Sequence, residues 1–127
     1  MSGSMSAGAP AGPADPAVPT LSLRTYLEGD ATVVHCSGNL IHGLTYILRD
    51  EVKPLIPQCK KIVLDLTELN KLDSMGLGSI VALYVSAKAS GTALILINLS
   101  PKIRDIFRIT NLWSVLEVYS ENIIRMP

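Results

Sequence analysis

The sequence predicts an α/β fold: a mostly parallel β-sheet packed against helices, with an antiparallel hairpin at one edge. Two observations lead to this prediction. Apolar and polar residues alternate before the turn signal Glu28-Gly29-Asp30, and the segment after it is rich in β-forming residues, as in a β-hairpin. After this hairpin, short apolar strand-like segments alternate with longer segments of helical periodicity. That alternation implies right-handed crossovers between parallel strands.

The chain begins with a segment that differs in composition from the rest. Residues 1–19 are mainly Ser, Gly, Ala and Pro, and such a segment buries too little apolar surface to offset its ordering entropy. We expect a flexible tail followed by one domain over residues 20–127. Residues 1–4 have the character of an expression tag ahead of a native start at Met5.

The hairpin is predicted first. Leu21–Leu27 alternates as a half-buried strand does, and Ala31–Ser37 is rich in β-formers and would pair back onto it. Gly38-Asn39 is expected to end the second strand. Apolar residues then recur at helical spacing from Leu44 to Leu55. Pro54 and Pro57 are expected to close that helix.

The remaining elements follow in order. Lys60–Leu66 is almost continuously apolar, which is typical of a central strand buried on both faces. Ser74–Ser90 is predicted as a helix that Gly91 ends, and Ala93–Asn98 as a further buried strand. The C-terminal part is expected to hold three more elements. They are a helix opened by Ser100-Pro101 with Ile103, Ile106, Phe107 and Ile109 on its apolar side, an edge strand at Val115–Tyr119 and a short element at Asn122–Met126.

The charge balance and composition exclude several classes of function. Lys+Arg and Asp+Glu both count 11, and 5% of residues are aromatic, so neither the basic surplus nor the stacking residues of a nucleic-acid binder are present. Cys36 and Cys59 form no metal framework. We expect one of them to be a small buried side chain and the other an ordinary thiol at the surface or at an element boundary. No apolar segment reaches the ~20 residues that span a bilayer. We therefore expect a cytoplasmic protein without a metal or cofactor.

The segment Leu72–Gly78 is the most informative in the chain. It follows an apolar strand and places Ser74 where a helix should begin. The first N–H groups of a helix lack intrahelical partners and carry partial positive charge, so a serine there caps the helix or carries a phosphate. Ser74 therefore has either a structural or a regulatory role.

An enzyme is not expected. A catalytic serine needs a base, and neither His35 nor His42 stands at a recognisable triad spacing from Ser74. Gly76 and Gly78 lack the lysine of a phosphate-binding loop and the third glycine of a dinucleotide fingerprint. These two glycines permit either close helix–sheet packing or access of a partner to the serine.

The helix that follows Ser74 has more apolar residues than one core stripe needs. Ile80, Leu83 and Ala87 are predicted to lie in the core. Met75 and Leu77 are expected to be partly exposed and to form an apolar docking surface beside Ser74. This surface and the hairpin edge would each support self-association, so a homodimer remains one possible state.

Several motifs together resemble the STAS domain, the domain of sulfate transporters and bacterial anti-sigma factor antagonists. The strand Val63–Thr67 followed by Leu72–Leu77 resembles the family's signature, and the likeness spans residues 21 to 120. The downstream residues Leu94–Leu96, Ser100-Pro101, Arg104, Phe107 and Thr110-Asn111-Leu112 are similar to its closing pattern. Upstream, Val33-Val34 and Gly38-Asn39-Leu40 resemble its second strand and the turn after it.

The resemblance implies a regulatory function. In antagonists of this family a serine at the head of the second helix, here Ser74, is phosphorylated. The unphosphorylated form binds an anti-sigma factor kinase and releases a sigma factor, the kinase uses ATP to phosphorylate the serine, and a phosphatase restores it. The partner-binding residues expected from this likeness surround the serine. They are Asn39, Ile41, His42, Asp73, Met75, Gly76 and Leu77.

One position departs from the family pattern. Many antagonists carry an acidic residue shortly after the turn glycine, whereas this chain has Ile41 followed by His42. The rim near Ser74 is therefore less acidic, which bears on partner specificity and on phosphorylation. The alternative is a STAS scaffold that phosphate does not switch, such as a stressosome-like protein or a cytoplasmic accessory subunit of a lipid-transport ATPase. In that case Ser74 is only a helix cap.

Overall fold

The computed structural model describes residues 18–110 and the backbone of residues 117–119. One sheet carries the strands in the spatial order β2-β3-β4-β5-β6. β2 (Leu21–Glu28) and β3 (Ala31–Leu40) pair antiparallel, and every other neighbouring pair is parallel. The predicted fold class is confirmed, including the antiparallel hairpin at the edge.

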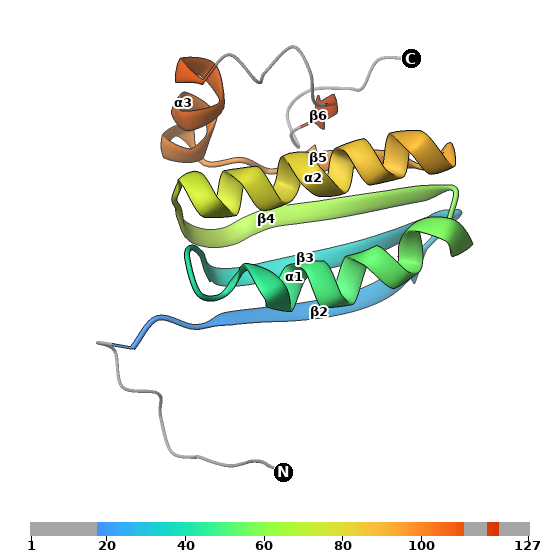
Figure 1. Cartoon of the computed structure of the whole chain (residues 1–127), viewed down its shortest axis with the longest axis horizontal. Helices are drawn as coiled ribbons and strands as arrows, with labels where there is room; N and C mark the ends of the chain where they lie inside the picture. The colour runs from blue at the N-terminus through green and yellow to red at the C-terminus, as the bar shows by residue number, and fades with distance from the viewer. Residues whose placement is uncertain (1–17, 111–116, 120–127) are drawn as a thin grey trace, which may run out of the picture.

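Helices and strands alternate after the hairpin, as Figure 1 shows. α1 (Thr45–Val52) continues into a 3-10 helix, η1 (Lys53–Gln58), and is followed by β4 (Lys61–Leu72), α2 (Ser74–Ser90) and β5 (Ala93–Ile97). α3 (Pro101–Ile109) and β6 (Glu117–Tyr119) complete the described part. α1, continued by η1, and α2 lie side by side across one face of the sheet, and α3 lies at one end of it (Figure 1).

The core lies between the sheet and the helices. Each inner strand points alternate residues at the helices, so Val34, Leu64 and Leu96 are buried at 0–1% exposure. α2 buries one stripe against them, formed by Gly76, Leu77, Ile80, Leu83 and Ala87. The predicted core positions Ile80, Leu83 and Ala87 are therefore confirmed.

Several predicted boundaries are wrong. β3 runs to Leu40 instead of ending at Gly38-Asn39, and β4 runs to Leu72 instead of Leu66. The two strand ends pair with each other through register shifts, so hydrogen bonds between strands keep a locally polar sequence extended. Gly38 has φ +109°, and a Cβ there would overlap the carbonyl oxygen of Thr20. Glycine is therefore needed at this bulge and does not end the strand.

Smaller differences concern the helices and strand ends. The α-helix ends at Val52, before the expected Leu55, and the chain continues into η1, which contains both prolines. Ile109 is 81% exposed, so it does not belong to the apolar side of α3. β5 ends at Ile97, because Asn98 adopts a left-handed conformation with φ 61°.

The remaining helix signals agree with the structure. Gly91 ends α2 with φ 76°, and the side chain of Ser100 caps α3 by accepting a hydrogen bond from the N–H of Ile103.

Cys36 is a buried free thiol, and burial raises its pKa to about 12. Three expectations fall wholly or partly outside the described residues. They are the tail at 1–17, the start of the strand expected at Val115–Tyr119 and the element at Asn122–Met126.

Candidate functional site

The connection between β4 and α2 places Ser74 at the first position of the helix. Asp73 precedes it in an extended conformation, with φ −105° and ψ −175°, and is the N-cap residue. Its Oδ1 accepts a hydrogen bond of 2.8 Å from the N–H of Gly76. Of the two roles considered for Ser74, that of the cap therefore belongs to Asp73, because Asp73 has the extended backbone that a cap requires.

The second oxygen of Asp73 connects two loops. Oδ2 accepts a hydrogen bond of 2.8 Å from the N–H of His42, in the loop between β3 and α1. Because β3 and β4 are parallel neighbours, both loops lie at the carboxyl end of the sheet, where ligand and partner sites of open α/β sheets are usually found. One carboxylate thus holds the loop of Ile41 and His42 beside the start of α2.

Asp73 is ionised across the physiological range. Partial burial alone would raise its pKa, but hydrogen bonds from the backbone N–H groups of His42, Gly76 and Met75 outweigh burial and lower the pKa below its ordinary value. The positive end of the α2 dipole also favours a carboxylate at this position. A fixed negative charge therefore stands directly beside Ser74.

The side chain of Ser74 has no structural role in the described part of the chain. It is exposed, and its hydroxyl makes no hydrogen bond to any residue in that part. The helix donors that a serine cap would use are already bound by Asp73. The hydroxyl is therefore free to react or to contact a partner.

The two glycines of α2 have different roles. A Cβ on Gly76 would overlap the carbonyl oxygen of Leu40, at the end of β3, so the helix packs against the strand only because residue 76 is glycine. A Cβ on Gly78 would meet nothing within 4 Å. Gly78 lies four residues after Ser74 and therefore on the same helix face. Close packing explains Gly76, whereas Gly78 leaves bare backbone next to the serine.

The structure brings together only some of the residues predicted to bind a partner. Met75 is 52% exposed, His42 is exposed and Ile41 is half-buried, all at the Ser74 end. Leu77 is only 6% exposed, so the expectation of a docking role is wrong for this residue. It belongs to the buried stripe of α2, because it lies three residues before Ile80 on the same face.

Two further predicted residues have structural roles. Gly76 is buried and cannot offer a side chain to a partner. Asn39 is half-buried, and both its backbone N–H and its side-chain amide donate to the carbonyl of Thr20. These contacts fasten the start of β2 to the end of β3. Below, "Ser74 site" refers to Ile41, His42, Asp73, Ser74 and Met75.

Sequence reasoning missed three exposed side chains in α1 and at the start of η1. Tyr46, in the first turn of α1, is 50% exposed, and an exposed aromatic residue is common at protein interfaces. It stands outside the apolar stripe of its helix, and this displacement is the signal that would have found it. Arg49 and Lys53 line a groove between α1 and α2, and their spacing of four residues places them on one face.

A separate polar cluster lies on the other face of the sheet. His35 contacts Asp65 through Nδ1 at 3.2 Å and Glu68 through Nε2 at 3.1 Å. The hydrogen bond to Glu68, followed by that to Asp65, raises the pKa of His35 even though burial opposes protonation. Burial would raise the pKa of Asp65, but hydrogen bonds from Thr67, Asn98 and His35 lower it. This arrangement favours an imidazolium held between two carboxylates.

The described part of the chain holds no group of three His, Cys, Asp or Glu side chains placed to bind a metal ion. Within that part, no helix has the length and hydropathy needed to cross a bilayer.

A protein family and individual known proteins are similar to this chain in sequence. Residues 22–122 match the model of the STAS domain family. The chain is 27% identical over 93 residues to the anti-sigma F factor antagonist of Paenibacillus polymyxa, covering 72% of this chain and 80% of the relative. It is 30% identical over 76 residues to the anti-sigma-B factor antagonist of Bacillus subtilis, covering 60% of this chain and 70% of the relative.

A solved structure of an anti-sigma factor antagonist from Mycobacterium paratuberculosis has the same fold. It superposes with a TM-score of 0.71 at 19% identity and covers 79% of this chain and 86% of its own. The family model covers most of the chain, including both loops of the Ser74 site. The chain belongs to the STAS domain family.

Proposed function

We propose that this protein is an anti-sigma factor antagonist that acts by partner switching in the cytoplasm. In its unphosphorylated form it binds an anti-sigma factor that is also a serine kinase. Phosphorylation of Ser74 releases it, and a phosphatase restores the binding form. The two relatives described above, an anti-sigma F and an anti-sigma-B factor antagonist, support the class of function.

The observation that carries the proposal is the free hydroxyl of Ser74. Asp73 supplies the cap of α2, so the helix does not need the serine side chain. An exposed hydroxyl at a fixed helix start is a suitable phosphate acceptor, because the backbone around it is already held in place by the bridge to His42. The position of the cap at Asp73 supports this proposal over the scaffold alternative in the form in which Ser74 is only a cap.

The chemical step is a phosphoryl transfer from ATP supplied by the kinase. Ser74 Oγ attacks the γ-phosphorus, the bond from that phosphorus to the β,γ-bridging oxygen breaks, and ADP leaves. The hydroxyl proton passes to a base on the kinase. The antagonist contributes only an accessible nucleophile in a fixed position, and it needs no catalytic residue of its own.

The added phosphate would change the surface and leave the fold intact. It carries about −1.5 to −2 charges. Because Asp73 already accepts hydrogen bonds from the first helix N–H groups, the phosphate would extend outward from the helix end. It would then lie among Met75, His42 and Asp73, on the surface that we assign to the partner. Charge repulsion and added bulk on that surface would expel the partner.

Binding of substituted proteins to the anti-sigma factor tests the proposal. Ser74→Ala should bind as the wild type does and should not be phosphorylated when ATP is added. Ser74→Asp should bind about 100-fold more weakly, equivalent to about 2.7 kcal/mol. Aspartate is favourable in the first turn of a helix, so the second variant should fold normally.

Ser90→Ala and Ser90→Asp are the matched controls, because Ser90 is exposed, as Ser74 is, and lies at the opposite end of the same helix. Isothermal titration calorimetry measures each affinity, and the phosphorylation reaction is followed by mass. Wild-type affinity in Ser74→Asp would contradict the proposal. Phosphorylation of Ser74→Ala at an unchanged level would contradict the assignment of the acceptor.

A further inference from the structure

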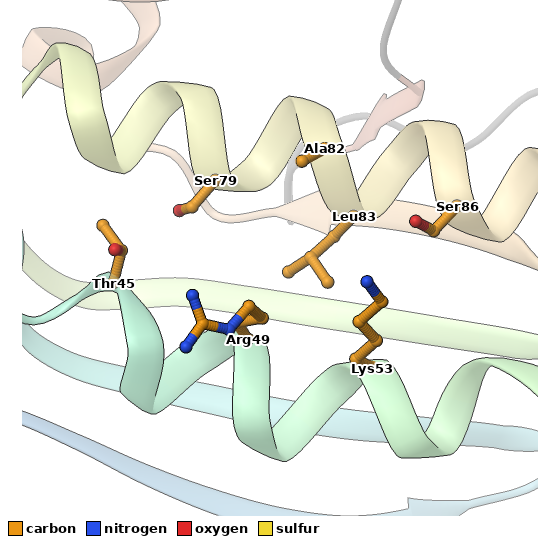
Figure 2. Close-up of a pocket in the computed structure, with 7 residues that line it drawn as sticks. All are labelled: Thr45, Arg49, Lys53, Ser79, Ala82, Leu83 and Ser86. Atoms are coloured by element: carbon orange, nitrogen blue, oxygen red, sulfur yellow. The ribbon is translucent and has the colours of Figure 1, made fainter.

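A groove lies between α1 and α2, beyond the Ser74 site, with a volume of about 170 Å³. Figure 2 shows Arg49 of α1 and Lys53, the first residue of η1, extending toward α2, and Thr45 and Ser79 facing one another at one end. Leu83, only 3% exposed, supplies an apolar floor. Ala82 and Ser86 complete the lining. We call this feature the α1–α2 groove.

The two charged side chains that line the groove, Arg49 and Lys53, are both cationic. α2 contains no acidic residue, so its wall offers only hydroxyl and apolar groups. On the opposite wall, Arg49 lies 3.4 Å from Asp50, with both side chains more than half exposed, and such a pair holds its charge only weakly. Within residues 18–110, no carboxylate lies within 4 Å of the Lys53 ammonium. Glu51 on the same helix is hydrogen-bonded to Thr25 of β2.

The length of the groove favours a polypeptide segment over a single small anion. Thr45, Arg49 and Lys53 are spaced four residues apart, which corresponds to about 12 Å along the helix. An extended chain covers that distance in about four residues. Cations, hydroxyl groups and an apolar floor in one row suit a segment that carries both carboxylate and apolar side chains.

We propose that the α1–α2 groove binds an acidic segment of the protein partner. Arg49 and Lys53 pair with its carboxylates, Thr45 and Ser86 offer hydroxyl groups, and Leu83 contacts an apolar side chain. The hydroxyl of Ser79 donates to the carbonyl oxygen of Gly76, so Ser79 lines the groove without donating to the segment. The identity of that partner as the anti-sigma factor rests on the proposed function. The groove thereby extends the binding surface from the Ser74 site along both helices.

This occupant explains why phosphate on Ser74 would weaken binding. Ser79 follows Ser74 by five residues, which is about 7.5 Å along the helix axis. This rise is about one Debye length, ~8 Å at physiological ionic strength, so salt screens a phosphate at Ser74 only partly from the nearer end of the groove. An acidic segment is therefore attracted by Arg49 and Lys53 and repelled by a phosphate at Ser74. A basic segment would respond with the opposite sign.

Binding of an acidic model peptide to the full-length protein tests the groove. ¹⁵N-labelled protein is titrated with N-acetylated hexaglutamate and, at matched ionic strength, with hexalysine and with inorganic phosphate. We expect saturable amide shifts that centre on Thr45, Arg49, Lys53, Ser79 and Ser86 with hexaglutamate only. The double variant Arg49→Gln/Lys53→Gln should bind about fivefold more weakly. The matched control Lys102→Gln/Arg108→Gln, with exposed cations on α3, should bind as the wild type does.

Three results would overturn the groove proposal. They are shifts that centre elsewhere, equal affinity in the groove double variant, and saturation by phosphate alone, which would indicate a small-anion site. The outcome is separable from the proposed function. If hexaglutamate does not bind but Ser74→Asp still releases the anti-sigma factor, only the groove proposal fails. If hexaglutamate binds in the groove but Ser74→Asp leaves that factor bound, only the proposed switch fails.

Discussion

At the scale of single residues, the sequence offers Ser74 two roles, that of helix cap and that of phosphate acceptor. In the structure Asp73 is the cap, which leaves the second role to Ser74. Both residue types are good helix caps, and they are neighbours, so residue preference alone cannot decide which of them is the cap. The backbone decides, because residue 73 is extended and residue 74 is already helical. This shift of one position leaves Ser74 free for modification.

Substitution of each residue separates the two roles. Asp73→Ala removes the cap and the bridge to His42, and we expect it to lower the free energy of unfolding by about 1–2 kcal/mol. Ser74→Ala removes no hydrogen bond of the described structure and should change that free energy by less than about 0.5 kcal/mol. Urea unfolding measures both. An equal loss in the two variants would show that the serine also supports the helix.

The two glycines of α2 give a second matched pair. Gly76→Ala places a methyl group against the carbonyl of Leu40, so we expect a loss of about 1–3 kcal/mol in unfolding free energy. Gly78→Ala meets open space and should stabilise the protein by roughly 0.5–1 kcal/mol, because alanine is the better helix former. Thermal and urea unfolding of both variants check the signs. Stabilisation by Gly76→Ala would contradict the close approach of helix and strand.

At the scale of elements, the sequence predicts helices and strands best where their signals are local. The α2 boundaries follow from the polar loop that places Ser74 at the helix start and from Gly91 after its end, and the structure has both boundaries. The ends of β3 and β4 could not be predicted in this way. Gly38-Asn39 and the polar residues after Leu66 have turn-like composition, and only pairing between the two strand ends keeps them extended.

Leu77 illustrates an error of a different kind. Leu77, Ile80, Leu83 and Ala87 are spaced by three, three and four residues, which is one helical stripe. The buried position of Leu77 was therefore available from the sequence. Met75 lies outside the stripe and is exposed, as expected. The exposed apolar surface beside Ser74 is therefore smaller than the apolar content of α2 indicates.

The His35 cluster joins β3 and β4 and gives a pH-dependent stability. The folded-state pKa of His35 is raised above its ordinary value of 6.5, first by Glu68 and then by Asp65. Its stabilisation is therefore fully present below pH 6.5 and is lost as the pH rises through the raised pKa. We expect the unfolding free energy of the wild type to fall over this range.

His35→Gln keeps a polar side chain but cannot titrate, so its stability should change less over the same pH range. Urea unfolding at a series of pH values measures both proteins, and NMR titration of the imidazole follows its pKa directly. Parallel curves for the two proteins would contradict the role of His35. Glu68→Gln should lower the pKa of His35 and move the loss of stability to lower pH.

At the scale of the whole molecule, the proposed partner-binding sites and the polar cluster around His35 lie on opposite faces of the sheet. The Ser74 site and the α1–α2 groove lie on the helices, whereas the His35 cluster lies on the opposite face of the sheet. Length, composition and periodicity were sufficient to predict the order of strands and helices. They could not predict the groove, because it forms only when two helices far apart in the sequence lie side by side (Figure 1).

The central claim is that Ser74 is the residue that phosphate switches. Phosphopeptide mass spectrometry on the protein isolated from its own cells, in growth and under stress, tests it most directly. Trypsin cuts after Lys71 and Lys88, so one peptide contains Ser74, Ser79 and Ser86, and fragment ions must separate them. The account predicts phosphate on Ser74 in a proportion that changes with condition. A fully covered peptide without phosphate on Ser74 in every condition, or with phosphate only on Ser79 or Ser86, would contradict it.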